Sequence, residues 1–124
     1  MLAPGELAAQ IANTVAFIAA NPSSIVLTPR TRHKDGSGTR FVNGTPRAPQ
    51  TLRLIDQSTA RNTIPGRVQT SDGVERLVDL ILLGHPAVIV ELWDFWVDGT
   101  GTLEVAEIYP SNQYELRAAV VRRA

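Results

Sequence analysis

The chain has no cysteine among its 124 residues and only two histidines. The lack of cysteine excludes disulfide bonds, thiolate chemistry and zinc sites with sulfur ligands. His33 and His85 lie far apart in the sequence, and neither has a second histidine at the spacing of a metal site. We therefore expect neither a metal site nor a cofactor.

Motifs of the common catalytic sites are missing as well. No glycine-rich phosphate loop precedes a helix, and no serine lies in a nucleophile elbow. The turns at 35–38 and 98–101 both begin with Asp-Gly, but they lack the further oxygen ligands and the closing glutamate of a calcium loop. These absences predict a protein that is not an enzyme.

No hydrophobic run is long enough to cross a membrane. The most apolar stretch, residues 7–20, is interrupted by Gln10, Asn13 and Thr14, and a bilayer span needs roughly 20 apolar residues. Residues 1–4 carry no basic side chain, so we expect neither a secretory signal nor a membrane partner.

The chain has 12 basic and 12 acidic side chains, but they are distributed unevenly along the sequence. Residues 30–67 contain eight basic and two acidic side chains, whereas residues 72–115 contain nine acidic and one basic. Such asymmetry indicates either a nucleic-acid surface or two surfaces of opposite sign that meet on neighbouring subunits. A solvated mixture of charged loops is the plainer alternative.

The apolar pattern predicts one domain, 1–124, with a helix in residues 1–22 and a β-barrel in residues 24–124. Leu7, Ile11, Val15 and Ile18 recur at helical spacing, and Asn21-Pro22 ends the helix. Dense Gly and Pro signals predict long loops at 33–49 and 56–72. The fold class expected is mainly β, a small antiparallel barrel of about six strands. The predicted strands are 24–28, 51–55, 74–83, 88–97, 103–108 and 114–122.

Alternation along the fifth predicted strand separates a buried face from a solvent face. Leu103 and Val105 alternate with Glu104 and Ala106, so the acidic side is expected to face water. The core residues predicted to be largely buried are Trp93, Phe95, Val105, Ile108 and Val120.

From residue 74 onward the strands and turns follow an ordered pattern. A strand ending Leu82-Leu83-Gly84 precedes an aromatic strand, the hairpin turn 98–101, the strand Leu103-Glu104-Val105-Ala106-Glu107-Ile108, Pro110 and a last strand at 114–121. In this respect the chain resembles the head-closure, or head-to-tail stopper, proteins of long-tailed bacteriophages. It departs from their usual form in its N-terminal helix and in Leu103, where an aromatic residue is common.

The resemblance implies a structural protein of the virion neck, present in the host cytoplasm during assembly. Such a protein forms a ring, of twelve or six copies, between the portal or adaptor protein and the tail-terminator or tail-tube protein. The ring closes the head, retains packaged DNA and provides the surface to which the tail attaches. The loop 56–72 would project into the channel, with Arg61 and Arg67 facing the DNA phosphates. The charges expected at contacts between subunits or rings are Arg30, Arg32, Arg40, Arg47, Glu91, Asp94, Glu104 and Glu107.

Other functions remain open at this point. The chain is also compatible with a tail-terminator or adaptor of the same neck, with a non-catalytic nucleic-acid-binding barrel, and with a small enzyme or an inhibitor of one. A nucleic-acid barrel would need basic residues around Trp93, whereas its sequence neighbours Glu91, Asp94 and Asp98 are acidic.

Overall fold

The computed structural model describes residues 3–36, 38–56, 67–110 and 113–123. Within these residues the chain has one helix and ten strands. In chain order they are α1 (Pro4–Ala20), β1 (Ser23–Ile25), β2 (Arg30–Asp35), β3 (Gly38–Asn43), β4 (Gln50–Asp56), β5 (Arg67–Gln69), β6 (Glu75–Leu77), β7 (Leu80–Gly84), β8 (Phe95–Asp98), β9 (Gly101–Ile108) and β10 (Leu116–Arg123).

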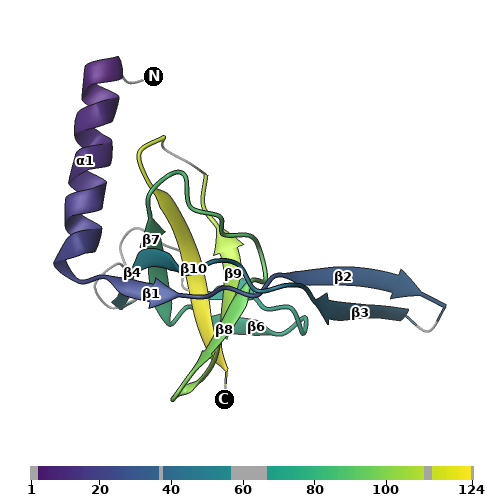
Figure 1. The fold of residues 1–124 in the computed structure, drawn as a ribbon. Coiled ribbons are helices and arrows are strands. Elements are labelled where there is room, and N and C mark those ends of the chain that lie inside the picture. The colour runs from purple at the N-terminus through teal and green to yellow at the C-terminus, as the bar shows by residue number, and fades with distance from the viewer. Residues whose placement is uncertain (1–2, 37, 57–66, 111–112, 124) are drawn as a thin grey trace.

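Six strands form one antiparallel sheet in the order β1-β4-β7-β10-β9-β8. Its two edges meet where Thr28, just after β1, pairs with Phe95 at the start of β8. Each residue donates a backbone hydrogen bond to the other, with N···O distances of 2.9 and 3.1 Å. The sheet is therefore a nearly closed barrel, and the predicted fold class is confirmed (Figure 1).

Branched and small side chains fill the barrel interior. Leu27, Leu52, Leu82, Leu103 and Val105 are fully buried there, and they come from strands that are distant in the sequence. Interior positions alternate with outward ones along each strand, so the β pattern of the sequence places these residues on one face. Burial of such apolar area is the main force that closes the barrel.

A second apolar layer covers the outer face of β7, β10 and β9. The ribbon of β5 and β6 lies over this face, and Val68 of β5 packs with Ile81, Ala106 and Val121. As a result residues 103–106 of β9 are buried on both faces. The predicted solvent face of this strand is wrong, because the ribbon excludes water from Glu104 and Ala106.

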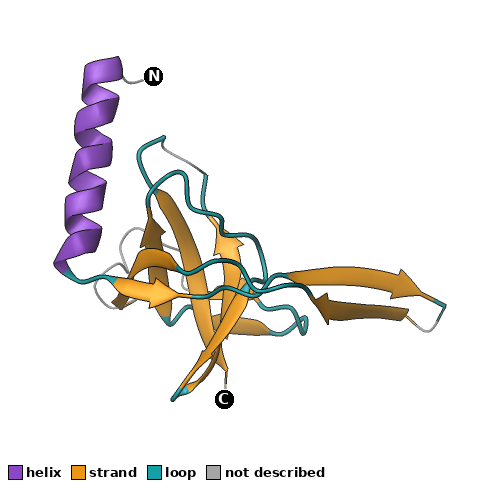
Figure 2. Cartoon of the chain, viewed as in Figure 1, coloured by secondary structure: helices purple, strands orange, loops and turns teal. Residues whose placement is uncertain are grey.

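Two elements extend from the barrel on different sides, as Figures 1 and 2 show: α1 and the hairpin of β2 and β3. Helix α1 begins at Pro4, where the missing N–H costs nothing, and ends before Asn21-Pro22. Its last turn is held to β4 by Arg53, which stacks on the Phe17 ring at 3.8 Å and donates to the Phe17 carbonyl at 2.7 Å. Among the described residues, no helix is both long and apolar enough to cross a membrane.

Two segments that the sequence predicts as loops contain strands. Most of 33–49 belongs to the β2–β3 hairpin, because the turn signal at Asp35-Gly36 connects two strands that pair along their whole length. Within 56–72, residues 67–69 form β5, while 57–66, with Arg61, lie outside the described residues. The Gly and Pro turn signals of 56–72 do not reveal β5, because its partner β6 lies outside that segment, at Glu75–Leu77.

Three predicted strands are too long, and part of the predicted core is exposed. The strand predicted at 24–28 ends at Ile25, residues 74–83 divide into β6 and β7, and of 88–97 only residues from Phe95 onward form a strand, since turns lie at 86–87 and 92–93. Val105 and Val120 are fully buried as predicted.

Trp93 and Phe95 are half-buried, because Trp93 lies in the second of these turns and Phe95 begins β8 at its end. Ile108 is exposed, because it is the last residue of β9 and lies beyond the buried positions 103–106.

Close packing around Gly84 provides a test of the barrel interior. A Cβ atom at Gly84 would lie 2.8 Å from both Leu52 Cδ2 and Val88 Cγ2. Gly84→Ala should therefore lower the free energy of unfolding by about 1–3 kcal/mol, the usual cost of overpacking. Urea unfolding measures the change, with Gly99→Ala as the control, because a Cβ there meets nothing within 4 Å. Equal effects of the two substitutions would contradict this packing.

Candidate functional site

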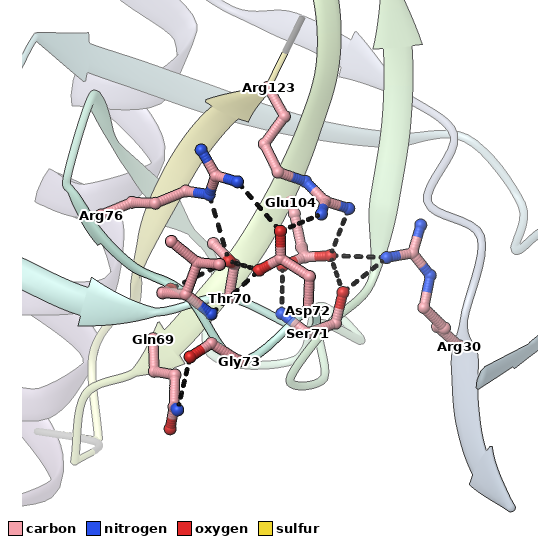
Figure 3. A network of polar contacts seen from close by, with 10 residues as sticks. Arg30, Gln69, Thr70, Ser71, Asp72, Gly73, Arg76, Glu104 and Arg123 are labelled. Carbon is pink, nitrogen blue, oxygen red and sulfur yellow. Dashed lines mark hydrogen bonds and ion pairs between the residues drawn. The ribbon is translucent and has the colours of Figure 1, made fainter. Parts of the chain in front are cut away.

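A buried carboxylate joins four segments of the chain at the side of the barrel. Glu104 of β9 is fully buried. Its Oε1 accepts hydrogen bonds from Arg30 Nη1 at 2.5 Å, Ser71 Oγ at 2.5 Å and Arg123 Nη2 at 3.1 Å. Its Oε2 accepts from the Ser71 backbone N–H at 2.8 Å. We refer to Arg30, Ser71, Asp72, Glu104 and Arg123 as the Glu104 network (Figure 3).

Asp72 extends this network to the turn between β5 and β6. Its Oδ2 lies 3.2 Å from Arg123 Nη1 and 2.9 Å from Arg76 Nη2, and its Oδ1 accepts from the Thr70 hydroxyl. The Thr70 hydrogen bond, followed by that of Arg76, holds the pKa of Asp72 well below its usual range. Arg123 therefore bridges two carboxylates, and the end of β10 is tied to both.

The contacts of the Glu104 network hold separate segments of the chain together. Among the described residues Ser71 is the hydroxyl bonded to Glu104, and two guanidinium groups pair with the same carboxylate. Within the described residues no three His, Asp or Glu side chains gather to hold a metal ion. A buried carboxylate with paired cations instead specifies one arrangement of the segments that carry them.

A second buried acid fixes the turn before β8. Asp94 is almost fully buried, and its carboxylate accepts from Arg47 Nε at 3.0 Å and from the Glu91 backbone N–H at 3.0 Å. The bond to Asp94 raises the pKa of Arg47. Trp93 in this turn has φ 71°, a strained value for a bulky residue. Its N–H donates to the Val105 carbonyl at 2.7 Å, which helps to hold the strained geometry.

This strained turn presents Trp93 between two surface hollows. The larger, of about 510 Å³, is lined by Arg67, Val68, Gln69, Leu92, Trp93, Ala106, Glu107 and Ile108. The smaller, of about 280 Å³, is lined by Arg32, Phe41, Trp93 and residues 69–73. Phe41 meets the Trp93 ring edge to face, with centroids 4.9 Å apart. We refer to these two together as the Trp93 hollows.

At least five of the eight charges expected at subunit contacts have a partner within the chain. Arg30 pairs with Glu104, and Arg47 pairs with Asp94 and, at 3.6 Å, with Glu91. These five charges therefore need no partner on a neighbouring subunit. Arg32 and Arg40 are exposed on the hairpin, and Glu107 is half-buried beside the larger Trp93 hollow.

Of the two residues predicted to face DNA, Arg67 is exposed at the first position of β5. Arg61 lies outside the described residues.

Sequence reasoning missed Ser71, Asp72 and Arg123, and it missed the approach of arginines to Trp93. Asp94, a sequence neighbour of Trp93, turns inward, and Arg32 and Arg67 line the hollows together with Asp72 and Glu107 from remote segments. An Asp-Gly turn at 72–73 was the available signal for part of the network. The contact between this turn and Glu104 forms because the β5–β6 ribbon lies over β9.

Removal of the Glu104 charge tests the network. Glu104→Gln leaves Arg30 and Arg123 largely buried without this carboxylate, so the free energy of unfolding should fall by about 3–5 kcal/mol. Glu107→Gln, three residues further along β9, should change it by less than about 0.5 kcal/mol. Urea unfolding measures both. A loss below about 1 kcal/mol for Glu104→Gln would mean that the network contributes little to stability.

No protein-family model, no curated protein sequence and no solved structure matches this chain.

Proposed function

We propose that the chain is a non-catalytic structural subunit of a bacteriophage neck. In this role copies of the chain form a ring of twelve or six between the portal or adaptor protein and the tail-terminator or tail-tube protein. The ring closes the head, retains packaged DNA and offers a surface for the tail. The resemblance of residues 74–121 to head-closure proteins supports this role, and the confirmed barrel fold agrees with it.

The observation that carries the proposal is the projecting β2–β3 hairpin. It leaves the barrel as a two-stranded ribbon, and Arg32, His33 and Arg40 are exposed on it (Figure 1). A two-stranded ribbon is marginally stable alone, so its persistence away from the core favours a role in contact with something else. Its basic side chains suit DNA phosphates or an acidic surface of the next subunit.

The base of the hairpin is anchored firmly enough to hold this arm in one direction. Arg30, its first residue, pairs with buried Glu104 and stacks on Phe95 at 4.2 Å. Arg47, just beyond β3, pairs with buried Asp94. An arm fixed at both ends can point into the channel of a ring, where the resemblance also places the loop 56–72. Arg32 and Arg40 are then the channel residues, together with Arg67.

Charge reversal on the hairpin tests this role. Arg32→Glu with Arg40→Glu should leave ring formation intact but lower the retention of DNA in assembled particles. With isolated rings, the slope of log K against log salt for duplex DNA should fall by about 1 for each phosphate that the variant no longer neutralises. Arg122→Glu is the control for each single reversal, Arg32→Glu or Arg40→Glu, because it makes the same charge change on an exposed barrel residue. Unchanged retention and unchanged slope would reject the DNA-facing role of the hairpin.

A second candidate function, single-strand nucleic-acid binding, is favoured by one specific observation. The Trp93 hollows combine two aromatic rings, Trp93 and Phe41, with the cations Arg32 and Arg67. Bases stack on exposed aromatic rings, and arginines beside them attract the phosphates. Glu107 at the larger hollow opposes this binding, so we rank this function second.

Titration with oligo(dT) separates the two candidates. Nucleic-acid binding at the Trp93 hollows predicts quenched tryptophan fluorescence, and Trp93→Ala should weaken binding by about 1–3 kcal/mol. Trp96→Phe should leave the affinity unchanged, because Trp96 packs against the barrel core. If oligo(dT) leaves the fluorescence of the chain unchanged at low salt, the second candidate is excluded.

A further inference from the structure

Helix α1 exposes an apolar surface that the described part of the chain does not cover. Of its 17 residues one is charged, Glu6, and two are buried, Thr14 and Ile18. Val15 and Phe17 remain 47% and 43% exposed. An isolated helix of this length is marginal in water, so most helices gain stability by packing. The uncharged surface of α1 therefore calls for an apolar partner.

A preformed apolar hollow lies at the foot of this helix. It measures about 210 Å³ and is lined by Val15, Ile18, Ala19, Thr51 and His85. His85 Nδ1 accepts a hydrogen bond from the Ala87 backbone N–H at 2.9 Å, so the proton of the neutral ring sits on Nε2. The Nε2–H group is thus the remaining ring donor of His85, which lines the apolar hollow. We refer to this feature as the α1 hollow.

The tip of the β8–β9 hairpin has the complementary chemistry. Val97 is 68% exposed, more than any other large hydrophobic side chain in the described residues. Asp98 follows it, and its carboxylate accepts from the Thr100 N–H at 2.7 Å and the Thr100 hydroxyl at 2.6 Å. An apolar side chain next to an acceptor matches an apolar hollow next to a donor.

We propose that the Val97–Asp98 tip of one copy docks into the α1 hollow of a second copy, with Val97 against Val15 and Asp98 accepting from His85. This inference rests on the proposed ring-forming function. The hollow lies beside the last turns of α1, at Val15, Ile18 and Ala19. The tip is the turn of the β8–β9 hairpin, at the bottom of Figure 1 and away from α1, so the contact joins two different surfaces. A heterologous contact of this kind generates a ring when its rotation closes.

The available area argues against a symmetric pairing of two α1 helices as the whole interface. A helix of 17 residues is about 25 Å long and 10 Å wide, so one half of its surface is roughly 400 Å². A stable interface buries about 800 Å² on each partner. A pair of α1 helices provides about half of that area.

Single cysteines test the contact directly, since the natural chain has none. Val15→Cys protein is mixed with Val97→Cys protein, oxidised, and examined by intact mass, which distinguishes each disulfide-linked pair. The mixed Val15–Val97 dimer should predominate. The control mixes Val15→Cys with Leu77→Cys, because Leu77 is 62% exposed on the β5–β6 ribbon. Equal yields in the two mixtures, or a predominant Val15–Val15 dimer, would overturn the proposed docking.

Oligomeric state gives the second measurement, by light scattering after size exclusion. Val97→Asp should convert rings to monomers, because it puts a charge in the apolar hollow, whereas Leu77→Asp should leave rings intact. Circular dichroism confirms that both variants fold. Rings that persist in Val97→Asp would reject the docking while the proposed ring function stands. A natural chain that stays monomeric at every concentration tested would reject both.

Discussion

The buried Glu104 carboxylate is the constraint on which the surroundings of the barrel depend. Removal of a carboxylate from water costs several kcal/mol unless cations and donors replace the solvent. Here Arg30, Arg123 and Ser71 do so, and each comes from a different segment. Because the buried carboxylate needs these three partners, the first residue of the β2–β3 hairpin, the β5–β6 turn and the end of β10 all lie beside Glu104.

Glu104 is buried because the barrel has a second layer. The ribbon of β5 and β6 covers the outer face of β9 and β10 with its own apolar contacts, through Val68 and Val78. Residues that would face water in a bare barrel lie between sheet and ribbon instead. Ala106 is small and apolar, so its burial needs no polar partner. The buried carboxylate of Glu104 needs the charges of Arg30 and Arg123.

The same layout explains why two elements extend from the body. The hairpin foot is fixed by Arg30 and Arg47, and the foot of α1 is fixed by Arg53, while neither element contributes much to the barrel core. A basic ribbon and a helix with a single charged residue, both held in fixed directions, present different surfaces to their surroundings. That division of surfaces is what a subunit of a closed assembly needs, since each copy must meet its neighbours on different faces.

Local physics made several elements predictable from the sequence alone. Helix α1 follows from apolar spacing and from Asn21-Pro22, the β8–β9 hairpin follows from Asp98-Gly99, and alternation placed Val105 and Val120 in the core. Each of these signals lies within a few neighbouring residues. The functional role was predicted by resemblance and stays a proposal.

Tertiary structure alone decided the burial of Glu104 and which residues surround Trp93. Arg47 meets Asp94 across 47 positions of sequence, and Arg30 meets Glu104 across 74. Such pairs form because the barrel brings remote segments side by side, and a short window of sequence contains no signal for which distant segment will lie beside it. Of the acids that flank Trp93 along the chain, Asp94 turns inward, and arginines from remote strands, Arg32 and Arg67, line the hollows beside Trp93.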